Sequence, residues 1–403
     1  RADQPVGAVT PVGGATACAG DHWVGAWRAA PQGSSLGRPG DADGPARTFV
    51  DQTLRMILST RVGGSAVRVH LGNRHGTAPV VLGGVTVARR DAGAALAPES
   101  VRPLTFAGSP SVTIAPGEIV LSDPVFVAVE PFADLAVSFH VVGTGVLDHH
   151  QWATTTSYAA PAGTGDHTTD TGAAAFTETL GSWFAVAGVD VLTAREVGAV
   201  VTLGDSITDG VGSTVDADHR WPDALARRLG DAGTPLSVVN VGIGGNHVVT
   251  SGLTSDIAVG PSATERLDRD VLGVGGATDV FVFEGINDLF NAQPGTDIAT
   301  ALIDGYRAII DRAHAAGLRV VGATITPGNL TDANEAARQA VNEWIRTSGA
   351  YDAVVDFDAV VRDPADPRRV RAEWDAGFAH LNDAGYAAMA AAIPLDAFQG
   401  TGC

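Results

Sequence analysis

The sequence contains no lysine, so arginine supplies all 26 basic residues against 45 acidic ones, and the formal net charge is −19. Proteins that bind nucleic acid or anionic membranes need a cationic face, so this balance argues against both partners. No uninterrupted apolar run approaches the ~20 residues that cross a bilayer, so we expect no stable membrane association. Global disorder is also excluded, because 45% of the residues are hydrophobic and only 18% are charged.

Cysteine is almost absent, since only Cys18 and Cys403 occur, one near each end of the chain. Two exposed thiols in terminal segments fit an oxidised compartment better than a reducing one. We therefore expect a disulfide between Cys18 and Cys403 and a secreted, extracellular protein. The sequence begins at Arg1 with no visible signal peptide, which either a removed leader or a trimmed chain explains.

Two kinds of pattern divide the chain, and we predict a tail at 1–20, an all-β domain at 21–193 and an α/β domain at 194–403. The tail is rich in proline, glycine and alanine without periodicity. Short runs of alternating apolar residues, fenced by turn residues such as Gly83-Gly84, then indicate a β-sandwich of jelly-roll-like form. These runs are Thr53–Leu58, Ala66–Leu71, Val80–Ala88, Ser111–Ile114, Ile119–Leu121, Val125–Val129 and Leu135–Val142.

From about residue 197 strand-like runs alternate with amphipathic helical stretches, which predicts a parallel, doubly wound sheet covered by helices. A helix over Asp297–Ala316 should end at Gly317, and Thr331 should cap a helix over Asp332–Arg346. Five strands are expected at Gly198–Leu203, Leu236–Val241, Thr278–Glu284, Leu318–Ile325 and Ala353–Phe357. No Pro/Gly-rich linker separates the two domains, so we expect them to pack against each other.

Polar residues lie where an open parallel sheet binds its ligands, at the carboxyl ends of strands. Ser206 follows the first strand, Gly245 lies in the loop after the second, Asn287 follows the third, and His380 precedes the last helix. A serine nucleophile needs a base, and histidine suits that role near neutral pH. The amides of Ser206 and Gly245 and the side chain of Asn287 can donate to a developing oxyanion. Together these residues predict acyl transfer.

Four sequence blocks at these positions resemble those of SGNH hydrolases, also called GDSL-type esterases and lipases. The blocks are GDSITDG at 204–210, NVGIGG at 240–245, EGIND at 284–288 and HLNDAGY at 380–386. They span nearly all of 197–403, and the preceding β region (HWVGAWRAAPQ, QTLRMIL, GNRHGTAPV, LSDPV) resembles the sandwich of secreted actinobacterial members. The resemblance implies a flavodoxin-like five-stranded sheet, with Ser206 as nucleophile, His380 as base, and Ser206, Gly245 and Asn287 as oxyanion-hole donors.

The histidine block departs from the pattern of the family, which usually has an aspartate three residues before the histidine. Gly377 stands at that position, and Leu381 replaces the proline that commonly follows the histidine. The nearest upstream carboxylate, Asp375, can orient the imidazole as a catalytic residue through a loop shortened by one residue. Alternatively, a backbone carbonyl of the Trp374–Phe378 stretch orients a Ser–His dyad, or the enzyme is impaired or uses an acid elsewhere.

Three further residues are candidates for the site. Asp205 is expected to brace the turn that carries the nucleophile, whereas His247 and Trp374 either line the mouth of the site or are turn and core residues. His149-His150 could seed a metal site, but adjacent side chains on a strand point apart, so we expect no metal. No organic cofactor is implied either.

We therefore expect a secreted serine esterase that hydrolyses small-molecule or polysaccharide esters with short acyl groups such as acetyl. The preference for short chains rests on the lack of an evident hydrophobic lid segment. A lipase or lysophospholipase acting on longer acyl esters is one alternative. A carbohydrate-binding protein whose hydrolase domain decayed at Gly377 is another, and activity on a simple ester distinguishes it. The sequence leaves the oligomeric state and the role of the β domain open.

Overall fold

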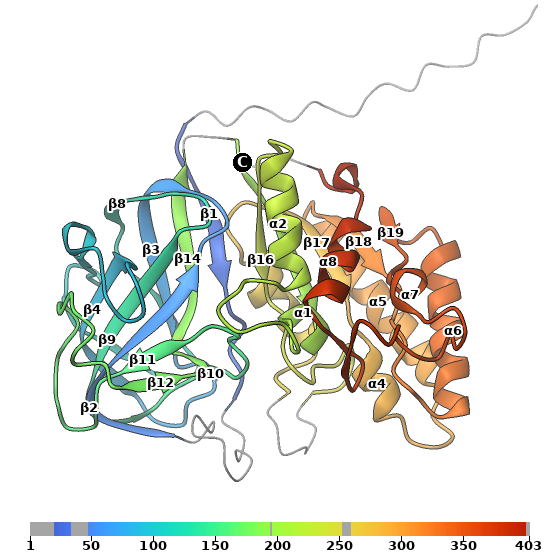
Figure 1. Cartoon of the computed structure of the whole chain (residues 1–403), viewed down its shortest axis with the longest axis horizontal. Coiled ribbons are helices and arrows are strands. Elements are labelled where there is room, and N and C mark those ends of the chain that lie inside the picture. The colour runs from blue at the N-terminus through green and yellow to red at the C-terminus, as the bar shows by residue number, and fades with distance from the viewer. Residues whose placement is uncertain (1–19, 34–46, 194–195, 252–258, 400–403) are drawn as a thin grey trace, which may run out of the picture.

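The computed structural model of the chain describes residues 20–33, 47–193, 196–251 and 259–399. The tail predicted at 1–20 falls outside these residues except for Gly20, and so do Cys18 and Cys403, whose pairing stays a prediction. Figure 1 shows a β-rich part on the left and a part with helices around a second sheet on the right. Within the described residues, no helix combines the length and apolar character that a membrane span requires.

The β domain is built from antiparallel sheets. Its strands are β1 His22–Arg28, β2 Thr48–Ser59, β3 Gly64–Gly72, β4 Val80–Arg89, β5 Arg102–Pro103, β6 Val112–Ile114, β7 Ile119–Leu121, β8 Val125–Val129, β9 Asp134–Val146, β10 His149–His150, β11 Ser157–Ala159, β12 Glu178–Leu180, β13 Trp183–Phe184 and β14 Val186–Thr193, with a 3₁₀ turn η1 at Pro98–Ser100. One sheet has the order β1-β14-β3-β7, with β8 also on β3, and a second has the order β12-β11-β2-β9-β4-β5, with β6 also on β4. Strands β10 and β13 form a separate two-stranded sheet. Val69 and Val189 of the first sheet share a buried cluster with Leu58 and Phe139 of the second, as in a sandwich.

One turn prediction in this domain was wrong. Gly83-Gly84 lie inside β4, where the pairing with β9 is irregular between Leu82 and Val85. A Cβ at Gly83 would lie 2.7 Å from Cγ2 of Val142. The glycine pair therefore permits the close approach of a neighbouring strand instead of forming a turn.

The α/β domain contains the predicted parallel sheet. Its elements are β15 Gly198–Gly204, α1 Ser206–Asp209, α2 Trp221–Asp231, β16 Leu236–Asn240, α3 Ala263–Leu267, a π-helical turn η2 at Asp268–Leu272, β17 Ala277–Phe283, α4 Ile286–Phe290, α5 Ile298–Ala315, β18 Arg319–Ala323, α6 Asp332–Thr347, β19 Ala353–Val355, α7 Phe357–Val361, β20 Asp375–Gly377, β21 His380–Leu381, α8 Asp383–Ala391 and a 3₁₀ turn η3 at Leu395–Ala397. The sheet order β16-β15-β17-β18-β19 is the flavodoxin-like order, which confirms the predicted fold class. The crevice in such a sheet lies where the order reverses, beside β15.

Local signals placed the helix ends correctly. Thr331 caps α6 by accepting a hydrogen bond from the amide of Asn334, and Gly317 follows α5 with a φ of 80°. A left-handed residue at this position favours glycine, because a Cβ would crowd the backbone. Short-range chemistry thus determined where these helices begin and end.

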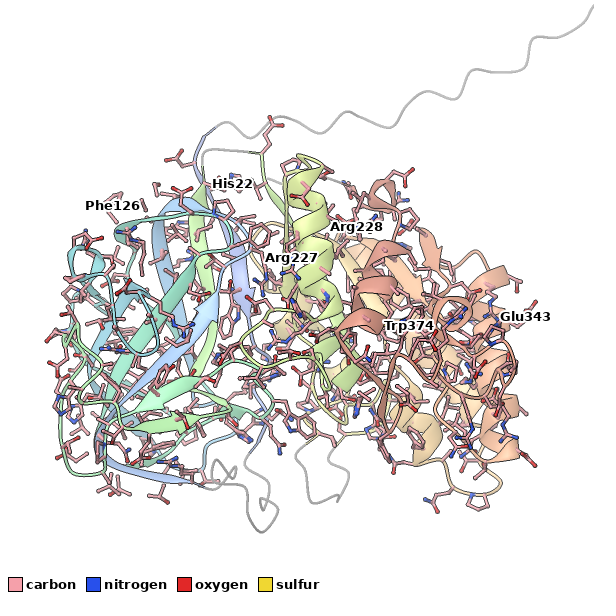
Figure 2. All side chains as sticks on the ribbon, viewed as in Figure 1. His22, Phe126, Arg227, Arg228, Glu343 and Trp374 are labelled. Carbon is pink, nitrogen blue, oxygen red and sulfur yellow. The ribbon has the colours of Figure 1, made fainter. Side chains whose placement is uncertain are left out.

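The two domains pack against each other through backbone and side chains. The amide of Gly25 in β1 donates to the carbonyl of Gly275 at 2.9 Å, and a Cβ at Gly25 would lie 2.7 Å from Cγ1 of Val274. Nε2 of His22, labelled in Figure 2, lies 3.0 Å from the carbonyl oxygen of Val197. The predicted boundary lies between β14, which ends at Thr193, and β15.

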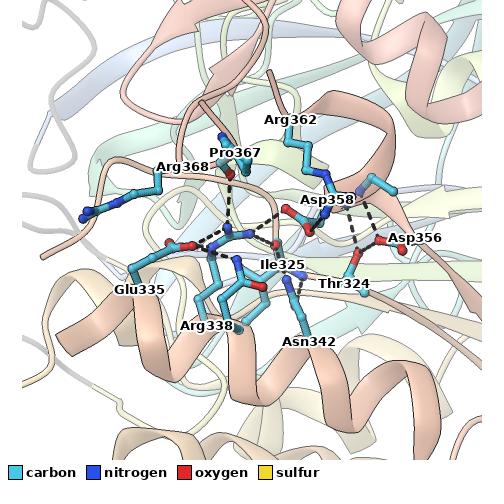
Figure 3. A network of polar contacts seen from close by, with 12 residues as sticks. Thr324, Ile325, Glu335, Arg338, Asn342, Asp356, Asp358, Arg362, Pro367 and Arg368 are labelled. Atoms are coloured by element: carbon cyan, nitrogen blue, oxygen red, sulfur yellow. Dashed lines mark hydrogen bonds and ion pairs between the residues drawn. The ribbon is translucent and has the colours of Figure 1, made fainter. Parts of the chain in front are cut away.

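A buried arginine braces the far side of the α/β domain (Figure 3). Arg338 on α6 donates to the carboxylates of Glu335 and Asp358 and to the carbonyl of Ile325 beyond β18. Its Nη2 also donates to the carbonyl of Pro367 at 3.4 Å. These bonds connect α6, α7 and the segment that leads to the β20–β21 hairpin.

Candidate active site

Ser206 stands at the first position of α1, directly after β15. The carboxylate of Asp205 caps this helix by accepting a hydrogen bond from the amide of Ile207 at 2.9 Å. Burial raises the pKa of Asp205 to about 7. The carboxyl braces the turn, as predicted from the sequence, and the serine is 7% exposed at the carboxyl end of β15.

His380 reaches this serine from the β20–β21 hairpin. Its Nε2 lies 2.8 Å from Oγ of Ser206, although the two residues are 174 positions apart in the chain. Burial lowers the pKa of His380 below its ordinary value, and the charge of Asp209 and a backbone hydrogen bond at Gly377 counteract this only in part. A neutral imidazole beside a hydroxyl is the state in which histidine accepts a proton.

The sequence suggested the imidazole of His380 as the partner of the Asp375 carboxylate, but the structure shows a backbone amide as its partner. The carboxylate accepts a hydrogen bond from the amide of Gly377 at 2.7 Å, and the whole stretch from Asp375 to Phe378 is exposed. Nε2 of His380 is engaged by Ser206, and a backbone hydrogen bond at Gly377 also acts on the imidazole. A backbone partner at Gly377 is compatible with the Ser–His dyad, which the sequence left open beside an Asp375 triad.

The predicted oxyanion donors lie around the serine on neighbouring strand ends. Gly245 has a φ of 76°, a left-handed conformation that favours glycine. The loop before it is tied to β15, because the amide of Ile243 donates to the carbonyl of Gly204 at 3.0 Å. Asn287 at the start of α4 donates one amide hydrogen from Nδ2 to the carbonyl of Asn246 at 3.0 Å, which fixes the orientation of its side chain. The second hydrogen of this NH₂ group is left for an oxyanion.

His247 lies behind these donors and not at an open edge of the site. It is 2% exposed, burial lowers its pKa to about 4, and its Nε2 accepts a hydrogen bond from Nδ2 of Asn291 at 2.9 Å. Asn291 also donates to the carbonyl of Asn287. The neutral histidine therefore supports the end of α4 from within the protein.

A buried arginine joins the strand ends below the serine. Arg266 donates to the carbonyls of Gly204 and Val241, at 3.0 and 2.5 Å, and to Oδ1 of Asn246 at 2.9 Å. Glu284 lies nearby, and burial raises its pKa well above the ordinary value. Neither of its carboxylate oxygens has a hydrogen-bond partner among the described residues.

Aromatic residues lie near the histidine, and Trp374 packs against helix α8. Trp374, labelled in Figure 2, is half-buried, and its Cβ lies 3.0 Å from where a Cβ of Gly385 would stand. The exposed ring is that of Phe378, which is 75% exposed, stacks on Phe290 at 5.1 Å between centroids, and lies 6.3 Å from the His380 ring. The sequence did not single out this phenylalanine.

The β domain also reaches the site, which no local motif indicated. Nε2 of His150 lies 2.8 Å from Oδ1 of Asp209, the last residue of the short helix that begins with Ser206. Trp152 packs against Gly244, beside the predicted donor Gly245. These contacts join positions about 60 to 90 residues apart, so only the folded chain reveals them.

The adjacent histidines His149 and His150, considered above for a metal site, have separate partners in the structure. His150 binds Asp209, whereas the ring of His149 stacks on Phe184 with centroids 6.1 Å apart. Burial lowers the pKa of His149 to about 4. Among the described residues, no three histidine, cysteine or acidic side chains gather as a metal ion would require.

A flavodoxin-like sheet with a serine–histidine pair at the carboxyl ends of its strands defines an SGNH-type hydrolase domain. Residues 202–388, which make up most of the α/β domain, match the model of the GDSL-like Lipase/Acylhydrolase family. This match indicates a carboxylic ester hydrolase domain.

Solved structures of related fold cover about half of this chain. A member of the lipolytic protein G-D-S-L family from Veillonella parvula is 20% identical over 48% of this chain and 95% of its own, with a TM-score of 0.35. A GDSL-like lipase from Bacteroides thetaiotaomicron is 16% identical over 49% and 87%, with a TM-score of 0.36. The acetyl xylan esterase AlAXEase is 20% identical over 48% and 96%, with a TM-score of 0.36. No curated protein matches the chain.

Proposed function

We propose that the protein is a serine esterase in which Ser206 is the nucleophile and His380 is the base, without a carboxylate as third member. The observation that carries this proposal is the 2.8 Å distance between Oγ of Ser206 and Nε2 of His380. The lowered pKa of His380 supports it, because the imidazole is then neutral and able to take a proton at neutral pH.

The reaction follows from the positions of these groups. Oγ of Ser206 attacks the carbonyl carbon of the ester while Nε2 of His380 takes the hydroxyl proton. The bond from the carbonyl carbon to the alcohol oxygen then breaks, and the imidazolium returns the proton to that oxygen. Water, deprotonated by His380, cleaves the resulting acyl-enzyme and releases the carboxylic acid and the free serine.

The amides of Ser206 and Gly245 and Nδ2 of Asn287 stabilise the negative oxygen that forms in each step. The carbonyl of Asn246 holds the Asn287 amide in place, so its orientation is fixed before the substrate arrives. Donors that are already oriented are more effective than water, which must reorganise around the developing charge.

Hydrolysis of p-nitrophenyl acetate by the full chain tests the proposal. We expect Ser206→Ala and His380→Ala to abolish turnover, and a fluorophosphonate to label wild-type Ser206 at one equivalent by mass spectrometry. Ser237→Ala is the matched control, because Ser237 is also buried and its hydroxyl has no partner among the described residues. Unchanged turnover in Ser206→Ala would refute the assignment, and a wild type without esterase activity would favour the binding-protein alternative.

Short acyl groups such as acetyl remain the proposed substrates, on simple alcohols or on polysaccharide. The exposed ring of Phe378 on Phe290 favours the second candidate, a lipase-like preference for longer chains, because it presents apolar surface near the histidine. Rates on p-nitrophenyl acetate, butyrate and decanoate, together with acetate release from acetylated xylan, separate the two. Phe378→Asn, which tolerates the φ of 53° at this position, should reduce the decanoate rate selectively if the ring contacts the acyl chain.

Secretion remains part of the proposal and rests on the two terminal cysteines. A change in electrophoretic mobility with a reducing agent would support their pairing. Unreacted thiols in the protein as isolated from its source would count against it.

A further inference from the structure

A segment of the β domain, residues 149–156, runs along the α/β domain beside the candidate active site; we call it the bridging segment. The amide of Thr156 donates to Oδ1 of Asp216 at 2.6 Å, and the amide of Asp216 donates to the carbonyl of Thr154 at 3.0 Å. Arg220, at the start of α2, donates to the carbonyl of Ala153. The bridging segment is therefore attached by hydrogen bonds to the loop between α1 and α2.

The indole of Trp152 lies directly on the glycine loop that carries Gly245. A Cβ at Gly244 would lie 1.8 Å from Cζ3 and 2.0 Å from Cε3 of Trp152, so only glycine permits this contact. On the other side of the loop, a Cβ at Gly245 would lie 2.8 Å from Cγ1 of Val259. The loop is thus held between an indole from one domain and a valine from the other.

The same segment also holds α1, the helix that begins with Ser206. Nε2 of His150 binds Asp209 at the end of this helix, and Nδ1 of His150 lies 2.9 Å from the carbonyl oxygen of Ala30. Both side chains of the His150–Asp209 pair are about 4% exposed. Nδ1 contacts a carbonyl of the β domain and Nε2 contacts a carboxylate of α1, so both ring nitrogens are engaged and the imidazole has one orientation.

We infer that the bridging segment sets the positions of the two backbone amides of the oxyanion hole, with Trp152 as the positioning residue for Gly245. Trp152 acts through the loop and needs no contact with the substrate. The inference rests on the proposed function, because it assumes that the amides of Ser206 and Gly245 bind the oxyanion.

The physical reason is that the oxyanion hole works only when its donors keep a narrow range of distances to the oxyanion. Donors must lie about 2.7–3.1 Å from the oxyanion, and a misplacement of about 1 Å can cost roughly 10² in rate. Glycine gives the loop many accessible conformations, so packing must select the productive one. The described contacts of Gly244 and Gly245 with Trp152 and Val259 supply that packing.

A double-mutant cycle on the full chain tests this role. Trp152→Ala should lower kcat about tenfold or more with a smaller change in KM, and Gly244→Ala should also lower kcat because its Cβ collides with the indole. Trp152→Ala combined with Gly244→Ala should be more active than Gly244→Ala alone, because the collision is removed.

Two variants serve as controls for this cycle. Gly172→Ala is the control for a glycine with nothing within 4 Å of its Cβ, and Trp344→Ala is the control for loss of a half-buried tryptophan elsewhere.

Inhibition by phenylboronic acid provides a readout that a merely structural role would not change. Its tetrahedral adduct with Ser206 fills the oxyanion hole, so Ki should rise with the loss of kcat in Trp152→Ala. Complete labelling by a fluorophosphonate, at one equivalent per folded molecule, shows that Ser206 and His380 remain intact. If Trp152→Ala does not fold, Trp152→Leu carries the same test, because it keeps apolar bulk while withdrawing the ring from Gly244.

The inference is overturned if Trp152→Ala and Trp152→Leu keep the wild-type kcat and Ki, or if removing the indole does not relieve Gly244→Ala. Either result leaves the proposed function standing as long as Ser206→Ala is inactive. Activity in Ser206→Ala would instead refute the proposed function itself, so the two failures are distinct.

Discussion

Asp375 accepts a hydrogen bond from the amide of Gly377 at 2.7 Å, and this local contact occupies the nearest carboxylate upstream of His380. The imidazole has its own backbone hydrogen bond at Gly377. One glycine therefore serves both side chains through its backbone, where the family usually has an aspartate.

Replacing Asp375 should accordingly have little effect on turnover. Loss of the third triad member costs about 10⁴ in a serine protease, whereas we expect Asp375→Ala to lose less than about tenfold in kcat. The measurement is kcat on p-nitrophenyl acetate, with His380→Ala as the inactive reference. A loss above about a hundredfold in folded Asp375→Ala would restore the carboxylate triad that the sequence suggested.

The pH dependence of kcat/KM should report the buried state of His380. Because burial lowers its pKa below 6.5, activity should be level at neutral pH and fall only in acid below that value, where the imidazole becomes protonated. Asp209 is the charged group that raises this pKa, so Asp209→Asn should move the acid limb to still lower pH. Asp375→Asn is the control and should leave the limb in place, and an unshifted limb in Asp209→Asn would contradict the electrostatic coupling.

Removing the side-chain donor of the oxyanion hole should reduce kcat strongly. We expect Asn287→Ala to lose about 10²–10³ in kcat, with little change in KM, because the donor acts on charge that develops in the transition state. Asn334→Ala is the matched control, since Nδ2 of Asn334 also binds helix α4, at the carbonyl of Leu289. Equal losses in the two variants would show that α4 had simply been destabilised.

Glu284 should make the folded protein less stable as the pH rises. Its folded-state pKa is raised by burial, so between the unfolded value of 4.5 and the higher folded value the native state holds a proton that the unfolded state has lost. Stability from this group is therefore present in acid and declines with increasing pH. Glu284→Gln removes this dependence, so its Tm relative to wild type should increase from pH 5 to pH 8, whereas exposed Glu265→Gln should show no such trend.

The interface between the domains depends on a buried ion pair. Nη2 of Arg61, in the turn after β2, lies 2.5 Å from Oδ1 of Asp223 on α2, and both side chains are buried. Arg61→Ala removes the closer cation from this buried carboxylate, which then keeps only Arg220 at 3.9 Å, and should cost about 3–5 kcal/mol in the free energy of unfolding by urea. Arg307→Ala breaks an exposed pair with Asp304 and should cost about 0–1 kcal/mol, and an equal cost for both would contradict the structural importance of the buried pair.

The sequence predicted what depends on local chemistry and on strand order. Helix caps, the five parallel strands and the approach of Ser206 to His380 followed from short motifs and from the rule that carboxyl ends share an edge. Within the β domain, the turn predicted at Gly83-Gly84 was wrong, because glycine occurs both in turns and where neighbouring strands approach closely.

Contacts between the domains could not be predicted in the same way. Trp152 on Gly244 and His150 on Asp209 join segments whose approach is set by how two separate folds pack. A backbone acceptor such as the one at Gly377 leaves no side-chain signal either, so the missing aspartate showed only that something else must orient the histidine.

The hydrogen bond between Gly25 and Gly275 bears on how this protein can be recombined with others. Both partners are glycines at a backbone-to-backbone seam, where a Cβ at Gly25 would meet Val274 and one at Gly275 would meet the carbonyl of Trp23. A sandwich borrowed from another protein would bring side chains to this seam. A chimera that exchanges the two halves therefore needs matching glycines at this seam before its catalytic residues matter.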